Sequence, residues 1–158
     1  MEKINFYGVN RNLRNSGKKY KFYSRKQNKI IEKEQAKIGP VCECKNKCMT
    51  KLNEKNPEII PTLFKEYWAL EEYNLQTAYL LGISERKLTE ASKKLGDENQ
   101  KRCKGITKYW VKFDNEITRV CRRAFASIHG IGTERVDYLN RNEKRNIAHM
   151  PAIELLNL

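Results

Sequence analysis

The stretch VCRRAFASIHGIGTERVDYL, residues 120–139, determines the fold that we predict for this chain. Its apolar residues recur at spacings of three and four on both sides of Gly130, which is typical of helices with one apolar face. The face of the first helix is formed by Ile117, Val120, Cys121, Ala124, Phe125 and Ile128. We therefore predict two helices joined by a glycine turn.

The turn matches the helix-turn-helix motif. That motif needs a small residue where the helices touch, a glycine with positive φ and an apolar anchor in the second helix. Ala126, Gly130 and Val136 have the usual offsets of four and six residues, and Thr133 can cap the second helix, residues 134–142. The same offsets recur in an acidic segment, which we interpret as core, at Ala78, Gly82 and Leu88.

The second helix is predicted to read or track a groove of DNA, because Arg and Thr readily contact phosphates and base edges. This role requires Val136 and Leu139 to be buried, and Arg135 and Arg141 to be exposed. Arg135 lies near the start of the helix, where base edges come within reach. The candidate nucleic-acid-binding residues of the two helices are Arg119, Arg122, Arg123, Thr133, Arg135, Tyr138 and Arg141.

Two carboxylates on the second helix oppose this role, because they would repel phosphate. Glu134 is compatible with DNA if it supports the helix N-terminus, and Asp137 is compatible if it pairs with Arg141 at i+4.

Upstream of these helices, residues 106–113 alternate apolar and polar side chains, which predicts a strand. Asp114-Asn115 is expected to end this strand and to cap the following helix. Residues 57–72 predict a helix, whose apolar face is formed by Ile60, Leu63, Phe64, Tyr67 and Trp68. A further helix is expected from Asn74, as its cap, to Gly82.

Three cysteines within seven residues, Cys42, Cys44 and Cys48, predict a zinc site. A structural zinc ion needs a fourth ligand, and we prefer Cys121. The other candidates are Cys103, His129 and His149, although His129 before Gly130 is more typical of a helix cap. Two metal-free interpretations remain open: three reduced surface thiols in a basic loop, and a Cys121 that only packs on the apolar face of its helix.

The 158-residue chain has a net charge of +13, and its ends are basic while its middle is acidic. Residues 1–38 hold 11 basic and 3 acidic residues and show little periodicity, so we expect a flexible arm, with a short helix between Ile30 and Ala36. The arm either orders on a polyanion or remains a solvated tail. Its candidate nucleic-acid-binding residues are Lys18, Lys19, Lys21, Arg25 and Lys26. A bias toward A·T-rich codons explains part of the charge but not its uneven distribution.

Several classes of protein are not indicated by the sequence. There is no apolar run of transmembrane length and no signal-peptide core, which favours a cytosolic or nuclear protein and no membrane partner. We find no phosphate-binding glycine loop, no Ser-His-Asp set and no paired carboxylates in an apolar context. We therefore expect that the chain is not an enzyme.

The chain resembles the N-terminal, pre-catalytic region of invertebrate DDE transposase-like proteins, which are abundant in aphids and other insects. The resemblance covers residues 42–139: the cysteine cluster, a Phe-x2-Tyr-Trp-x-Leu helix, a Tyr-containing strand and, most specifically, Val120 to Leu139. In that family, similar segments precede an RNase H-like catalytic domain. The resemblance implies recognition of DNA ends by analogy, and residues 140–158 depart from the family's continuation.

These features together predict a mainly α-helical domain with a small β element, like a helix-turn-helix DNA-binding domain and stapled by zinc. We expect three parts: an arm at 1–38, a helical domain at 39–142 and a tail at 143–158. The predicted function is duplex DNA binding in the nucleus by a truncated or domesticated transposase-like protein without a catalytic domain. The alternatives are a protein-interaction module of transposon origin and an RNA-binding protein.

Overall fold

The computed structural model describes residues 6–88 and 105–141 of the chain. These residues form a small mixed α/β domain, in which helices make up 45% of the described residues and the strands form two small antiparallel sheets. The described helices are α1 (Phe6–Asn15), α2 (Cys48–Lys55), α3 (Ile59–Ala69), α4 (Tyr73–Gly82), α7 (Arg122–Ile128) and α8 (Thr133–Arg141). The described strands are β1 (Tyr20–Ser24), β2 (Lys29–Lys33), β3 (Ser84–Leu88), β4 (Gly105–Phe113) and β5 (Glu116–Val120). The β content is thus larger than the sequence predicted.

The three-stranded sheet has the order β3-β4-β5, with β4 in the centre. The predicted strand at 106–113 is confirmed as β4, and its Tyr109 and Val111 are buried. The first predicted helix is wrong at its start, because residues 116–120 form β5 and Ile117 is exposed. Asp114 and Asn115 both have positive φ, so they make a tight hairpin turn instead of a helix cap.

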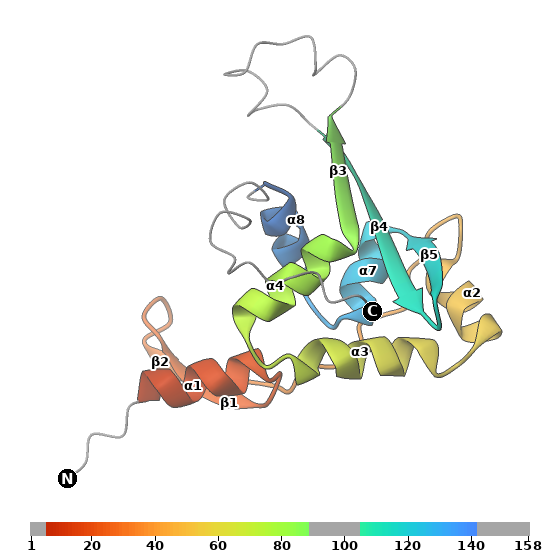
Figure 1. Cartoon of the computed structure of the whole chain (residues 1–158). Coiled ribbons are helices and arrows are strands. Elements are labelled where there is room, and N and C mark those ends of the chain that lie inside the picture. The colour runs from red at the N-terminus through yellow and green to blue at the C-terminus, as the bar shows by residue number, and fades with distance from the viewer. Residues whose placement is uncertain (1–5, 89–104, 142–158) are drawn as a thin grey trace.

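Helix α3 lies along the base of the molecule (Figure 1) and contacts α2, α4, α7 and β4. Its predicted apolar face is confirmed, since Ile60, Leu63 and Tyr67 are fully buried. Helix α4 begins at Tyr73 after an extended Glu72, so the predicted cap at Asn74 is wrong. The core therefore forms between α3, α7 and the inner face of the sheet.

Two helices do follow one another around Gly130, as predicted. Helix α7 is joined to α8 through a turn in which Gly130 has φ +62°, and Ala126, Val136 and Leu139 are buried. The other match to the motif offsets is not a helix-turn-helix: strand β3 follows Gly82, and Gly82 does not adopt a positive φ.

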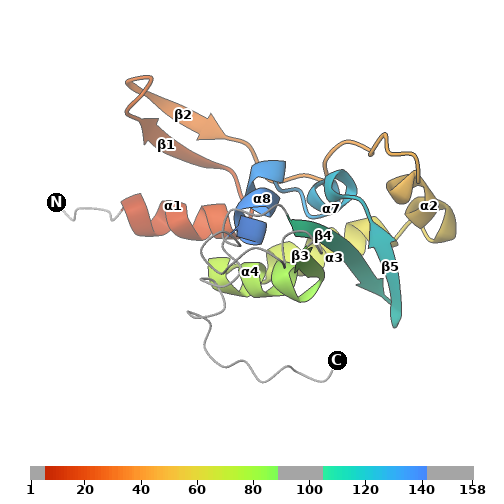
Figure 2. The ribbon, with the colours of Figure 1, turned by 90° about the horizontal axis from the view of Figure 1, so that it is seen from above.

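The N-terminal segment, for which we expected a flexible arm, has regular secondary structure in the residues that the structure describes there. They form α1 and a hairpin of β1 and β2, and Figure 2 shows both at the end of the molecule opposite α2. Ile30 lies in β2 instead of a helix, because two adjacent β-branched residues favour a strand and Asn28, at φ +50°, makes the hairpin turn.

Several predictions fall on residues 89–104 and 142–158, which lie outside the described residues. They concern Cys103, His149 and the tail at 143–158. Within the described residues, no helix has both the length and the apolar character needed to cross a lipid bilayer.

Candidate metal centre and basic groove

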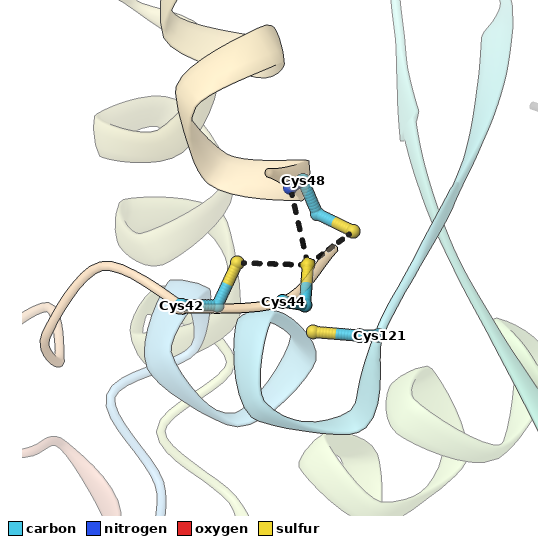
Figure 3. Close-up of side chains that lie close together, drawn as sticks. All are labelled: Cys42, Cys44, Cys48 and Cys121. Carbon is cyan, nitrogen blue, oxygen red and sulfur yellow. Dashed lines mark hydrogen bonds between the residues drawn. The ribbon is translucent and has the colours of Figure 1, made fainter. Parts of the chain in front are cut away.

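Four cysteines from three segments of the chain converge on one point (Figure 3). Cys42 and Cys44 lie in the loop before α2, Cys48 is the first residue of α2, and Cys121 is the cap residue that precedes α7. A tight turn with Lys47 at φ +46° returns the loop so that Cys48 faces Cys44. The predicted convergence of these four residues is confirmed.

The distances between the sulfur atoms suit a single tetrahedral ion. The Cys44 Sγ lies 3.6 Å from the Cys42 Sγ and 3.4 Å from the Cys48 Sγ, and all four sulfurs lie within 4.8 Å of one another. Four thiolates at about 2.3 Å from a zinc ion would be about 3.8 Å apart. All four cysteines are free, and the measured sulfur distances are too long for a disulfide. The cluster is therefore a plausible metal site.

The surroundings of the sulfurs favour thiolate at one position and oppose it at others. The backbone N–H of Cys48 donates to the Cys44 Sγ at 3.5 Å, and this is the main reason why the pKa of Cys44 falls to about 6. Burial raises the pKa of Cys121 to about 12, although its Sγ accepts the N–H of Ala124 at 3.3 Å. Burial also raises the pKa of Cys48. A cation bound within the cluster would favour the deprotonated form of the buried thiols Cys48 and Cys121.

The structure changes the geometry that each metal-free interpretation assumed. Cys42 and Cys48 are buried, so the loop does not carry three surface thiols. Cys121 does not pack on the face of a helix, because the helix starts one residue later and the sulfur points to the other cysteines (Figure 3). His129 is the buried C-cap residue of α7, as expected. Its Nδ1 forms a hydrogen bond with the Phe125 carbonyl at 2.8 Å.

A basic groove of about 760 Å³ begins next to Cys121 and extends between the sheet and α8. Asn140 of α8 joins the two sides: its carbonyl accepts a hydrogen bond from Arg86 at 2.6 Å, and its Nδ2 donates to the Tyr109 hydroxyl at 2.6 Å. The charged residues that line the groove are Arg86, Lys108, Arg119, Arg122, Arg141 and Asp137. Five basic residues and one acidic residue thus line the groove.

The carboxylate in the groove is held by one of these cations. The Arg122 guanidinium donates to the Asp137 carboxylate at 2.6 Å. The condition under which Asp137 would be compatible with DNA, a pairing of its carboxylate with Arg141, is met by Arg122 instead. The Arg141 Nε donates to the Asp137 backbone carbonyl at 3.3 Å. This arrangement leaves the groove with an excess of positive charge.

The predicted nucleic-acid-binding residues of the two helices do not share one surface. Arg119, Arg122 and Arg141 line the groove. Arg123 and Thr133 line a separate hollow beside residues 37–43, and Tyr138 is exposed. The predicted nucleic-acid-binding residues of the N-terminal segment lie on the β1–β2 hairpin and in the loops at its two ends.

The prediction of an exposed Arg135 is wrong. Its guanidinium lies over the ring of Tyr73 at 4.6 Å, and its Nε and one terminal nitrogen are buried without a hydrogen-bond partner. The helix α8 packs on α7 and turns this side chain toward α4, so Arg135 cannot reach a base edge without leaving its site.

Sequence reasoning missed Arg86 and Lys108. Both lie on strands whose pairing brings them beside α8, and Arg86 comes from the acidic segment around Gly82 that we interpreted as core. The alternation around Lys108 was visible, but the position of its strand relative to α8 follows only from the tertiary structure.

No protein-family model matches this chain, and no curated protein or solved structure matches it either.

Proposed function

We propose that this domain binds nucleic acid, with duplex DNA as its ligand, and that a zinc ion in the four-cysteine cluster holds the binding surface together. The observation that carries the proposal is the groove between the sheet and α8, which is lined by five basic residues and by one carboxylate that is already paired. Phosphates of a duplex are the ligand class that such a surface attracts most strongly.

The groove lies next to the cysteine cluster, which connects the proposed DNA-binding surface to the proposed zinc site. Cys121 and Arg122 are adjacent in the chain and both line the groove. A metal ion on Cys121 would therefore fix the end of β5 and the start of α7, and with them Arg119 and Arg122. Zinc suits the site, because it prefers four thiolates in tetrahedral geometry and closed sites of this kind are structural, not catalytic.

The resemblance to the pre-catalytic region of DDE transposase-like proteins supports the same function. It implies a nuclear protein of transposon origin that recognises DNA. The contact surface in this proposal differs from a reading helix: α8 contributes Arg141 to one wall of the groove, and Arg135 contributes packing.

The test measures the affinity for a fluorescent duplex over a range of salt concentrations. The variant Arg119→Ala/Arg141→Ala removes two groove cations, and Lys51→Ala/Lys65→Ala removes two exposed cations from α2 and α3, outside the groove. If both groove residues contact phosphate, the slope of log affinity against log salt should fall by about two for the groove variant. The control variant should retain the slope of the original protein.

Equal losses in both double variants would mean that binding reflects net charge alone, which contradicts a groove. Binding to single-stranded probes in preference to the duplex would contradict the choice of ligand.

A further inference from the structure

The β1–β2 hairpin is the second basic surface of the molecule, and no part of the groove argument uses it. Figure 2 shows the hairpin projecting beside α1, away from the three-stranded sheet. Its base is fastened to the core: the N–H of Ala36 donates to the Gly17 carbonyl at 2.8 Å, and Gly17 lies directly against Trp68. An isolated two-stranded hairpin is marginally stable in water. The stability of the hairpin tip therefore depends on what the tip contacts.

The two faces of the hairpin differ in exposure. Ile31 and Tyr20 are half-buried on one face, where β1 contacts α1. Tyr23 and Ile30 are cross-strand partners on the other face, and they are 58% and 70% exposed. An apolar pair is thus presented to solvent on a ribbon only two strands wide.

Basic side chains surround this apolar pair. Residues 18–34 contain seven basic and two acidic residues. One of the acidic residues, Glu32, forms salt bridges with Lys19 and Lys21 at the base of the hairpin. The cations nearest to the turn are Arg25, Lys26 and Lys29. A ligand that fits this surface is polyanionic at its edges and offers apolar contacts between them.

We propose that the hairpin enters the major groove of the duplex, with Tyr23 and Ile30 against the base edges and the cations of the turn on the flanking phosphates. The major groove is about 12 Å wide and admits a two-stranded β-ribbon. Thymine methyl groups in that groove offer apolar contact, and phosphates on both sides match the charge. The inference rests on the proposed function, because it requires that the protein binds duplex DNA.

The first experiment separates apolar from ionic contacts by their salt dependence. Tyr23→Ala/Ile30→Ala should weaken duplex binding by about tenfold or more, with an unchanged salt slope, because apolar burial releases no counterions. Arg25→Ala/Lys26→Ala should instead lower the salt slope by about two. Ile117→Ala is the control, since Ile117 is 67% exposed and lies on β5, outside the hairpin.

The second experiment uses the unaltered protein, so it does not depend on how the variants fold. A duplex that carries 5-iododeoxyuridine places its photoreactive atom in the major groove. Cross-linked peptides identified by mass spectrometry should contain Tyr23. Cross-links that map only outside residues 20–33 would overturn the proposal.

The other outcomes also discriminate between the two proposals. If the groove variant loses duplex binding but Tyr23→Ala/Ile30→Ala behaves as the control does, the hairpin proposal fails and the groove proposal stands. If the hairpin variant loses binding only to single-stranded probes or to anionic lipid vesicles, the ribbon serves another ligand and the major-groove role is overturned. If the original protein binds no duplex at all, both proposals fail.

Discussion

At the scale of single residues, Arg135 shows how tertiary packing changes the role of a basic side chain. Its guanidinium lies over Tyr73 and its inner nitrogens are unpartnered, so the attraction between the cation and the ring fixes α8 against α4. The hydroxyl of the neighbouring Tyr67 is also buried without a partner, and burial raises its pKa to about 12. Burying polar atoms without a hydrogen-bond partner costs free energy, so these groups do not stabilise the fold by themselves.

The buried imidazole of His129 makes the stability of the protein depend on pH. His129 is completely buried among Phe125, Tyr67 and Tyr79, and burial lowers its pKa from 6.5 to about 4. The folded protein therefore keeps His129 neutral between these pH values, while the unfolded chain binds a proton. The free energy of unfolding should fall as the pH is lowered from about 6.5 to about 4, by up to about 3 kcal/mol.

Urea unfolding of the original protein and of His129→Gln at several pH values measures this effect. The difference between the two stabilities should narrow as the pH falls through that range, because the variant lacks the titrating group. A difference that stays constant with pH would contradict the buried neutral state of His129.

At the scale of elements, the turn between α7 and α8 positions both helices against the rest of the chain. Gly130 has φ +62°, and a Cβ at this position would lie 2.6 Å from the Lys37 carbonyl oxygen and 2.6 Å from a Phe64 ring carbon. The absence of a side chain at Gly130 therefore allows the positive φ of the turn. It also allows the turn to pack closely against α3 and against the segment before the cysteines. Gly39 strengthens this contact, because its N–H donates to the Ser127 carbonyl at 2.8 Å.

Two glycine substitutions test the role of this turn. Gly130→Ala should lower the free energy of unfolding by about 2 kcal/mol or more, because both the positive φ and the close contacts oppose a Cβ. Gly82→Ala is the matched control, since Gly82 ends α4 with open space around it and a φ outside the left-handed region. The control should leave stability unchanged or raise it by up to about 1 kcal/mol. Equal effects of the two substitutions in thermal melts would contradict a special role of the turn.

At the scale of the whole molecule, the cysteine cluster joins segments that are distant in the sequence. Cys48 and Cys121 lie 73 positions apart, and the cluster connects the loop before α2 to the junction of β5 and α7. In a domain of this size, one ion that crosslinks such segments contributes a large part of the folding free energy.

Removal of the metal should therefore destabilise the whole domain. Protein purified without chelator should contain about one zinc ion per chain, and chelation should lower the melting temperature by more than about 10 °C. Cys121→Ala should remove the metal, whereas Cys103→Ala should retain it. Metal content that survives in Cys121→Ala and disappears in Cys103→Ala would show that the fourth ligand has been assigned wrongly. A melting temperature that does not respond to chelation would contradict a structural role.

Local patterns in the sequence were sufficient for several features. The spacing of Ile60, Leu63 and Tyr67 predicted α3, the alternation around Tyr109 and Val111 predicted β4, and Gly130 predicted the turn before α8. Each of these signals depends on the period of one element or on the backbone freedom of one residue, and neither requires knowledge of distant contacts. The three cysteines at positions 42, 44 and 48 likewise indicated a metal site and the need for a fourth ligand.

Only the tertiary structure decided the features that depend on neighbours distant in the chain. Residues 116–120 have a helical apolar pattern, yet they form β5, because pairing with β4 through the Asp114-Asn115 turn outweighs a weak local preference. Arg135 is half-buried because its guanidinium lies over the Tyr73 ring of α4, and Arg86 lines the groove because β3 pairs with β4. The sequence by itself determined α3, β4, the turn at Gly130 and three of the cysteines that can bind a metal. The tertiary packing decided which face of each element is exposed to solvent, because exposure depends on the neighbouring element that covers the other face.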